Sequence, residues 1–167
     1  MSTFIKEVSD YLQALSTAHK DIVHNTINSY AFCRFQDQQQ FNQLVQNSAR
    51  NIVVVMNFFG RSSGSFDDAT VTNTIVVRFS VYAKLVTSQE ITIAVEKSFS
   101  IMMQFWSRMR YDFEQDNCEW MRWINWEGIQ FDEIEQPWLQ NHYGWELAIP
   151  YKTHLPEFDQ TKWNDIP

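Results

Sequence analysis

Glycine and cysteine are both scarce in this chain, which holds four glycines and two cysteines among 167 residues. So few glycines leave almost no material for the glycine-rich loops that cradle phosphate groups. Cys33 and Cys118 lie far apart in sequence, and neither belongs to a CxxC pair or has a companion histidine at metal-ligand spacing. We therefore expect two reduced, mostly buried thiols, and neither a metal nor another cofactor.

Long hydrophobic runs and an excess of positive charge are also missing. No run approaches the roughly 18 apolar residues of a membrane-spanning helix, and Lys6, Glu7 and Asp10 stand where a signal peptide needs an apolar stretch. Twenty acidic against 13 basic residues give a net charge of −7, which argues against a protein that coats nucleic acid. We expect a cytoplasmic protein with no membrane partner.

Tryptophan and negative charge are concentrated in the carboxy-terminal third. All seven tryptophans fall between Trp106 and Trp163. Residues 1–111 hold 10 basic and 8 acidic residues, a balance of +2, whereas residues 112–167 hold 3 basic and 12 acidic residues, a balance of −9. Because tryptophan and tyrosine are enriched in protein interfaces, this third is predicted to be an acidic, aromatic surface that contacts other proteins.

The first 59 residues contain four predicted elements. Apolar residues at three- and four-residue steps predict an amphipathic helix over residues 3–24. The aromatic run 29–35 predicts a short strand, and the run 37–49, with Asp37 as its N-cap, predicts a short helix. The β-branched run 51–59 predicts a strand that is covered on both faces.

The remaining elements include the longest strand and the longest helix. Strict alternation over residues 71–85 predicts a long strand, and the polar residues 60–69 before it form a candidate extended arm. A helix of about 25 residues is predicted from Ser88 onward. The runs 120–134 and 141–154 are both strand-like, and the second alternates cleanly.

This order of elements predicts an α+β fold. Strands joined as hairpins, with helices inserted between them, indicate a single mostly antiparallel sheet with a long helix and an N-terminal helix packed on one face, and a long β-hairpin arm. We expect all helices on that single face. A hydrophobic content of 44% supports one core, so residues 1–154 are predicted to form one domain and residues 155–167 an extended C-terminal tail.

Templates for catalytic and metal sites find little support. The four histidines are His19, His24, His142 and His154. They form no HExxH motif, no HxH motif and no pair at i, i+4 spacing. Asp112, Glu114 and Asp116 copy the first three ligand positions of a calcium loop but lack the glycine at its sixth position. We interpret these carboxylates as a solvated helix end, and we predict that the protein is not an enzyme.

Three tryptophans at regular spacing suggest a stacking platform for sugars or bases. On an extended strand, Trp120 and Trp126 would share one face and Trp123 would lie on the other. The carboxylates around them would repel a phosphate backbone. We therefore favour a split of these side chains between the core and an interface, without specific recognition of nucleic acid.

The element order resembles that of a known family of phage proteins. An N-terminal amphipathic helix is followed by the strands NIVVVMNFF and VTNTIVVRFSVYAKL with an arm between them, a long helix, and a closing hairpin that ends in GWELAIPYK. Over residues 3–152 this order is similar to the tail terminator and tail-completion proteins of tailed bacteriophages. The resemblance implies a virion subunit that forms a hexameric ring, caps the tail tube and joins tail to head, with the tail tube protein and the head–tail connector as partners.

A ring of identical subunits needs two different patches that meet between neighbours. We expect the arm and its flanking strands to provide one patch and the acidic aromatic third to provide the other. The candidate interface residues are Arg50, Arg61, Phe66, Arg78, Trp126, Asp132, Glu133 and Glu135. Acidic surface elsewhere on the ring would line a channel through which DNA slides without sticking.

Three other functions remain open. One is a small domain that binds a ligand or partner in a pocket between the sheet and the long helix. The expected lining of that pocket is Met102, Trp106 and Trp145. Another is an enzyme with a site built from His142, Glu146 and His154, and the last is a different neck or baseplate component of a phage or a phage-derived contractile injection system.

Overall fold

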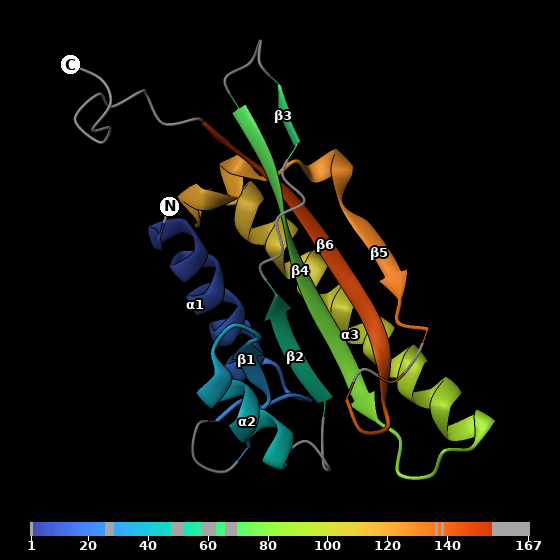
Figure 1. The fold of residues 1–167 in the computed structure, drawn as a ribbon. Helices are drawn as coiled ribbons and strands as arrows, with labels where there is room; N and C mark the ends of the chain where they lie inside the picture. The colour runs from blue at the N-terminus through green and yellow to red at the C-terminus, as the bar shows by residue number, and fades with distance from the viewer. Residues whose placement is uncertain are drawn as a thin grey trace, which may run out of the picture.

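In the computed structural model, the described part of the chain folds around one sheet of six strands, and helices accompany the sheet (Figure 1). This is the predicted α+β class. The structure describes residues 2–25, 29–47, 52–57, 63–65, 70–135, 137 and 139–154. The α-helices are α1 (Ser2–Ala18), α2 (Gln38–Asn47) and α3 (Ser88–Glu114), and two 3-10 helices are η2 (Glu119–Trp123) and η3 (Trp126–Gly128). The strands are β1 (Phe32–Arg34), β2 (Ile52–Asn57), β3 (Ser63–Ser65), β4 (Thr70–Tyr82), β5 (Gln130–Glu133) and β6 (His142–His154).

The strands run in the order β1-β2-β4-β6-β5, and β3 pairs with the start of β4. The β1–β2 pair is parallel and all other pairs are antiparallel, so the sheet is mostly antiparallel as predicted. Its longest ladder joins β4 to β6 over the whole length of both strands, whereas β2 pairs with β4 over six residues. The rest of the predicted arm, and the predicted tail 155–167, lie outside the described residues.

The long strand β4 follows the predicted alternation. Ile75, Val77 and Phe79 are fully buried on one face. Val76 and Arg78 between them are less buried, and Ser80 after them is buried on the other face. The pattern was expected to continue to Leu85, but β4 ends at Tyr82 and Leu85 is 59% exposed. The prediction was therefore right for the faces and too long at the end.

Helices α1 and α3 pack on the same face of the sheet and close the main core (Figure 1). Val8 and Leu12 of α1 and Phe105 of α3 are buried there against Val54 and Phe79. This confirms the expected placement of the N-terminal and long helices.

Helix α2 lies on the opposite face, so the expectation that all helices share one face is wrong. Leu44 of α2 packs against Cys33, Val53 and Val55, and the two valines point away from Val54, which faces the main core. All six residues of β2 are buried, as predicted. A strand that is apolar on both faces requires a second cover, and α2 provides it.

Both α2 and α3 begin at a side-chain cap. Asp37 Oδ1 accepts the N–H of Gln40 at 3.1 Å, which confirms the predicted N-cap of α2. In α3 the capping residue is Thr87, one position before the expected Ser88, and its hydroxyl accepts the N–H of Glu90 at 3.3 Å.

Helix α1 ends at Ala18, six residues earlier than predicted. The chain turns sharply after it, and Val23 has a φ of 46° in the left-handed region, which is rare for a β-branched residue. The turn buries His24, whose Nδ1 accepts the backbone N–H groups of Ala31 and Phe32 at 3.1 Å each. These two bonds tie the turn to β1.

We expect this buried histidine to make the protein less stable in mild acid. Burial lowers the pKa of His24, and protonation of Nδ1 would break both amide bonds. An unfolded histidine takes up a proton near pH 6.5, so below that pH the unfolded state binds more protons than the folded state and the free energy of unfolding falls. The fall continues until the pH reaches the lowered pKa of the folded state.

Urea unfolding of the wild type and of His24→Phe between about pH 7.5 and pH 5 tests this prediction. The variant should be less stable at neutral pH, but its stability should change less across this interval. The control Ile93→Val changes an exposed side chain without a titratable group and should keep the wild-type slope. Equal slopes for wild type and His24→Phe would contradict the prediction.

The segment 120–134 differs most from its prediction, because only its end is a strand. Helices η2 and η3 occupy residues 119–128, and β5 follows. Trp120 is buried in the core, Trp123 is 43% exposed, and Trp126 is half-buried. Trp120 therefore lies in the core and Trp123 at the surface, and the tryptophans do not lie on one strand as predicted. Gly128 fits the tight turn, since a Cβ there would stand 2.8 Å from Asn125 Nδ2.

Candidate functional site

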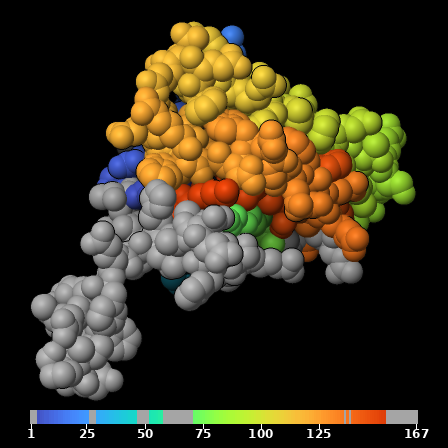
Figure 2. Space-filling view, turned by 90° about the horizontal axis from the view of Figure 1, so that it is seen from above, coloured from blue at the N-terminus to red at the C-terminus, as the bar shows by residue number. Residues whose placement is uncertain are grey.

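The end strand β5 carries an acidic surface that we call the acidic edge, made of residues 130–135. Asp132, Glu133 and Glu135 are exposed there, and none of them forms an ion pair with another described residue. Within the described parts of the chain, β5 pairs only with β6, so its other side presents unpaired backbone groups. An open edge of this kind is a template for pairing with another chain. Figure 2 shows the yellow and orange segments after α3 gathered into one continuous surface.

On the face of the sheet opposite α3, Asp132 of the acidic edge lies beside a carboxylate that already has an ion-pair partner. Arg78 of β4 stands opposite Glu146 of β6, and its Nε donates to Oε1 of that glutamate. Asp132 stands on the other side of Glu146. Like charges at directly paired positions repel each other, so a cation from a partner would stabilise this side of the acidic edge.

An aromatic cluster lies between the acidic edge and α3. Phe131 of β5 packs edge-on against Trp106 at 6.0 Å between ring centroids, and Trp106 packs on Trp126 at 5.1 Å. Phe113 contacts the same Trp126 at 4.7 Å and is 38% exposed. The cluster therefore packs between β5 and α3 and reaches the molecular surface.

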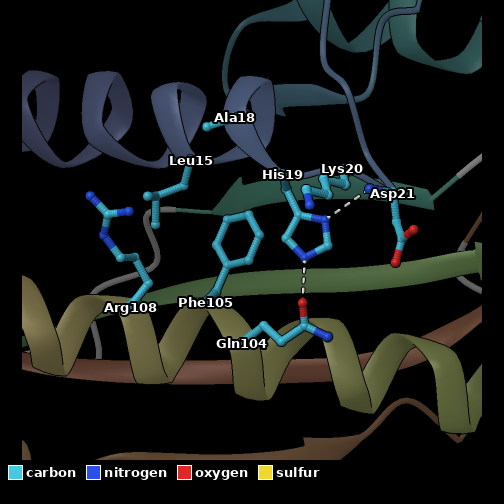
Figure 3. A pocket seen from close by; sticks show the side chains of 8 residues that line it. All are labelled: Leu15, Ala18, His19, Lys20, Asp21, Gln104, Phe105 and Arg108. Carbon is cyan, nitrogen blue, oxygen red and sulfur yellow. Dashed lines mark hydrogen bonds between the residues drawn. The ribbon is translucent and has the colours of Figure 1, made fainter.

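A hollow of about 430 Å³ opens between the end of α1 and the middle of α3 (Figure 3). His19 Nδ1 accepts the N–H of Asp21 at 3.2 Å, which places the ring proton on Nε2, and Nε2 donates to Gln104 Oε1 at 2.9 Å. Phe105 lies beside the His19 ring. The lining residues are Leu15, Ala18, His19, Lys20, Asp21, Gln104, Phe105 and Arg108.

One end of this hollow leads to a buried carboxylate that joins α1 to α3. Asp112 accepts hydrogen bonds from Tyr11 Oη at 2.7 Å, Arg108 Nε at 2.8 Å and Asn117 Nδ2 at 3.2 Å. Burial alone would raise the pKa of Asp112, but these three bonds outweigh it and lower the pKa. Burial and the bond to Asp112 raise the pKa of Tyr11, so its hydroxyl stays protonated and donates.

Each of the three carboxylates that copy a calcium loop therefore binds a different partner in the chain. Asp112 is buried, so its assignment to a solvated helix end is wrong, whereas Glu114 and Asp116 are exposed as expected. Arg110 pairs with Glu114, and Arg122 pairs with Asp116. The described residues include no group of three or more metal-ligating side chains. Burial raises the pKa of Cys33 to about 12, so this thiol keeps its proton.

The predicted interface residues lie in different parts of the structure, and some lie outside the described residues. Arg50, Arg61 and Phe66 lie outside the described residues. Arg78 pairs with Glu146 of its own chain. The remaining four lie together around β5: Trp126 in the aromatic cluster, and Asp132, Glu133 and Glu135 on the acidic edge.

The two other predicted sites are not assembled. Met102 is fully buried, and Trp106 and Trp145 are half-buried and pack against other rings, so these side chains fill space and do not enclose a pocket. His142, Glu146 and His154 all lie on strand β6. A strand rises about 3.3 Å per residue, which separates the two histidines by roughly 40 Å. A single catalytic site from these three residues is therefore excluded.

The sequence analysis missed the hollow because its walls come from distant segments. His19 and Gln104 are 85 positions apart, and no local spacing joins them. The one available signal was Lys20, a charged residue at the end of an apolar helical stripe.

Fold and site together define an α+β protein with an acidic, aromatic sheet edge and a separate hollow beside α1. Comparison with protein-family models, with curated proteins and with solved structures found no match. Among the described residues, the helices are too short or too polar to cross a membrane.

Proposed function

We propose that this chain is a structural subunit of a phage tail or neck, which forms a hexameric ring, caps the tail tube and joins it to the head. The acidic edge is the observation that carries this proposal. It combines an open strand edge, three exposed carboxylates without ion pairs among the described residues, and an aromatic cluster that reaches the surface. These features fit a surface that another protein covers.

The order of elements supports the same proposal. The N-terminal helix, the long strand β4, the long helix α3 and the closing strand β6 are present in the order on which the phage resemblance rests. In this proposal the tail tube protein and the head–tail connector bind the two sides of the ring, and acidic surface lines a channel that DNA passes without sequence recognition.

Native mass spectrometry from low to high micromolar concentration tests the ring. We expect the wild type to form a sixfold species, and we expect the variant Asp132→Lys/Glu133→Lys to remain monomeric, because reversed charge on the edge would repel its neighbour. The control Glu96→Lys changes an exposed glutamate of α3 and should assemble like the wild type. A wild type that stays monomeric and does not sediment with tail tubes would contradict the proposal.

The hollow beside α1 favours a second candidate function, a domain that binds a small ligand. Its floor is apolar, and Lys20, His19 and Gln104 provide polar groups at the rim. Such a protein would stay monomeric at every concentration. The same mass spectra therefore separate the two candidates.

A further inference from the structure

Most cations in the described parts of the chain already have an acidic partner in the same chain. The paired ones are Lys6, Arg34, Arg78, Arg108, Arg110 and Arg122. The described cations without an ion pair are Lys20, Lys84, Lys97 and Lys152. Of these four, Lys20 lines the hollow at the end of α1.

The rim of the hollow carries exposed cations that complement the carboxylates of the acidic edge. Lys20 is exposed at the rim, and the Arg108 side chain is 58% exposed even though its Nε binds Asp112. Figure 3 shows Arg108 and Asp21 at opposite ends of the hollow, with His19 and Phe105 between them. Lys20 lies next to Asp21, which would repel an incoming carboxylate, so the favourable position is on the side of Lys20 that faces Arg108.

The two surfaces also lie in different parts of the molecule. The acidic edge is at the β5 end of the sheet, whereas α1 packs beside β1 at the other end (Figure 1). One chain therefore presents two unlike patches, an acidic edge and a hollow with an unpaired lysine at its rim. A contact between unlike patches is heterologous, and repetition of it closes a ring when the rotation between neighbours permits.

We propose that the acidic edge of one copy docks against the hollow of a second copy, with Glu133 and Glu135 near Lys20 of the neighbour. This inference rests on the proposed ring and names the two surfaces that meet in it. The apolar floor formed by Leu15, Ala18 and Phe105 is covered in the contact. Because the facing charges are at the surface, salt weakens the contact.

A charge exchange between two variants tests this pairing. The edge variant is Glu133→Lys/Glu135→Lys, and the hollow variant is Lys20→Glu/Gln104→Glu, which leaves Arg108 and Asp112 in place. Each variant alone brings like charges together at every contact, so its half-assembly concentration should rise at least about tenfold. In an equimolar mixture, every edge of one variant faces the hollow of the other, and the ring should return with equal numbers of both.

Native mass spectra of each variant and of the mixture give the result, because the exchanged residues distinguish the two chains by mass. The controls Lys84→Glu and Glu96→Lys carry the same kinds of charge change at exposed positions outside the hollow and the acidic edge, and both should assemble like the wild type. A hollow variant that assembles normally, or a mixture that does not, overturns the pairing and leaves the ring standing. A wild type that never assembles overturns both.

Discussion

Gly144→Ala is expected to destabilise the protein by about 3 kcal/mol, because the new methyl group would meet backbone atoms. Gly144 of β6 pairs with Ser80 in the long ladder with β4. An ideal Cβ at this position lies 2.7 Å from Ser80 Cα and 2.9 Å from the Phe79 carbonyl carbon. A side chain can rotate away from such a contact, but the central strand of a sheet cannot move without disturbing its own hydrogen bonds.

Urea unfolding followed by tryptophan fluorescence measures this cost. The matched control is Gly128→Ala, where the new Cβ meets the side chains of Asn125 and Pro150 at 2.8 and 3.0 Å. Those atoms can shift, so we expect a loss of about 1 kcal/mol at Gly128. Equal midpoints for Gly144→Ala and the wild type would show that β4 and β6 approach each other less closely than the structure indicates.

The sequence predicted elements well where one periodic pattern covered many residues. The alternation in β4 and β6 and the long apolar stripe of α3 are each set by burial of one face, and burial is what the structure shows. Predictions were weaker at element ends. The α1 stripe continues past Ala18 in sequence, but the hydrogen bonds of His24 to Ala31 and Phe32 turn the chain instead.

Tryptophan-rich sequence was the other source of error. Large aromatic residues favour strands, yet η2 and η3 turn the chain so that Trp120 enters the core and Trp126 meets Trp106. The packing of these rings depends on α3, which local propensity does not include.

The candidate site was predictable only in part. Exposed carboxylates such as Glu133 and Glu135 are visible from charge alone, because charged residues without partners stay at the surface. The hollow around His19 and Gln104 and the burial of Asp112 both depend on contacts between α1 and α3, and Tyr11 is 101 positions from its partner Asp112. Contacts at such separations leave no signature in a single sequence.

Asp112→Ala is expected to reduce the free energy of unfolding by about 3 kcal/mol, because the half-buried Tyr11 hydroxyl loses its charged hydrogen-bond acceptor. Tyr11 Oη and Asn117 Nδ2 would lose their acceptor, while the exposed guanidinium of Arg108 would turn to water and contribute little. Tyr11→Phe removes one of these bonds and should cost about 2 kcal/mol. Urea unfolding at neutral pH gives both values.

Glu114→Ala is the matched control, since it removes an exposed carboxylate of the same helix and an ion pair with Arg110. It should change stability by less than about 0.5 kcal/mol. The double variant Tyr11→Phe/Asp112→Ala should lose clearly less stability than the sum of the losses in the two single variants, because both substitutions remove the same hydrogen bond. Full additivity would mean that the two side chains do not interact.

Asp112 and His24 affect the free energy of unfolding in different pH ranges. The folded-state pKa of Asp112 is lowered, so its contribution is present above the unfolded value near pH 4 and is lost as the pH falls through the lower folded value. The contribution of His24 is already lost as the pH falls below about 6.5. The free energy of unfolding, plotted against pH, should therefore show two declines on acidification. Asp112→Ala removes the one at lower pH, and His24→Phe removes the one at higher pH.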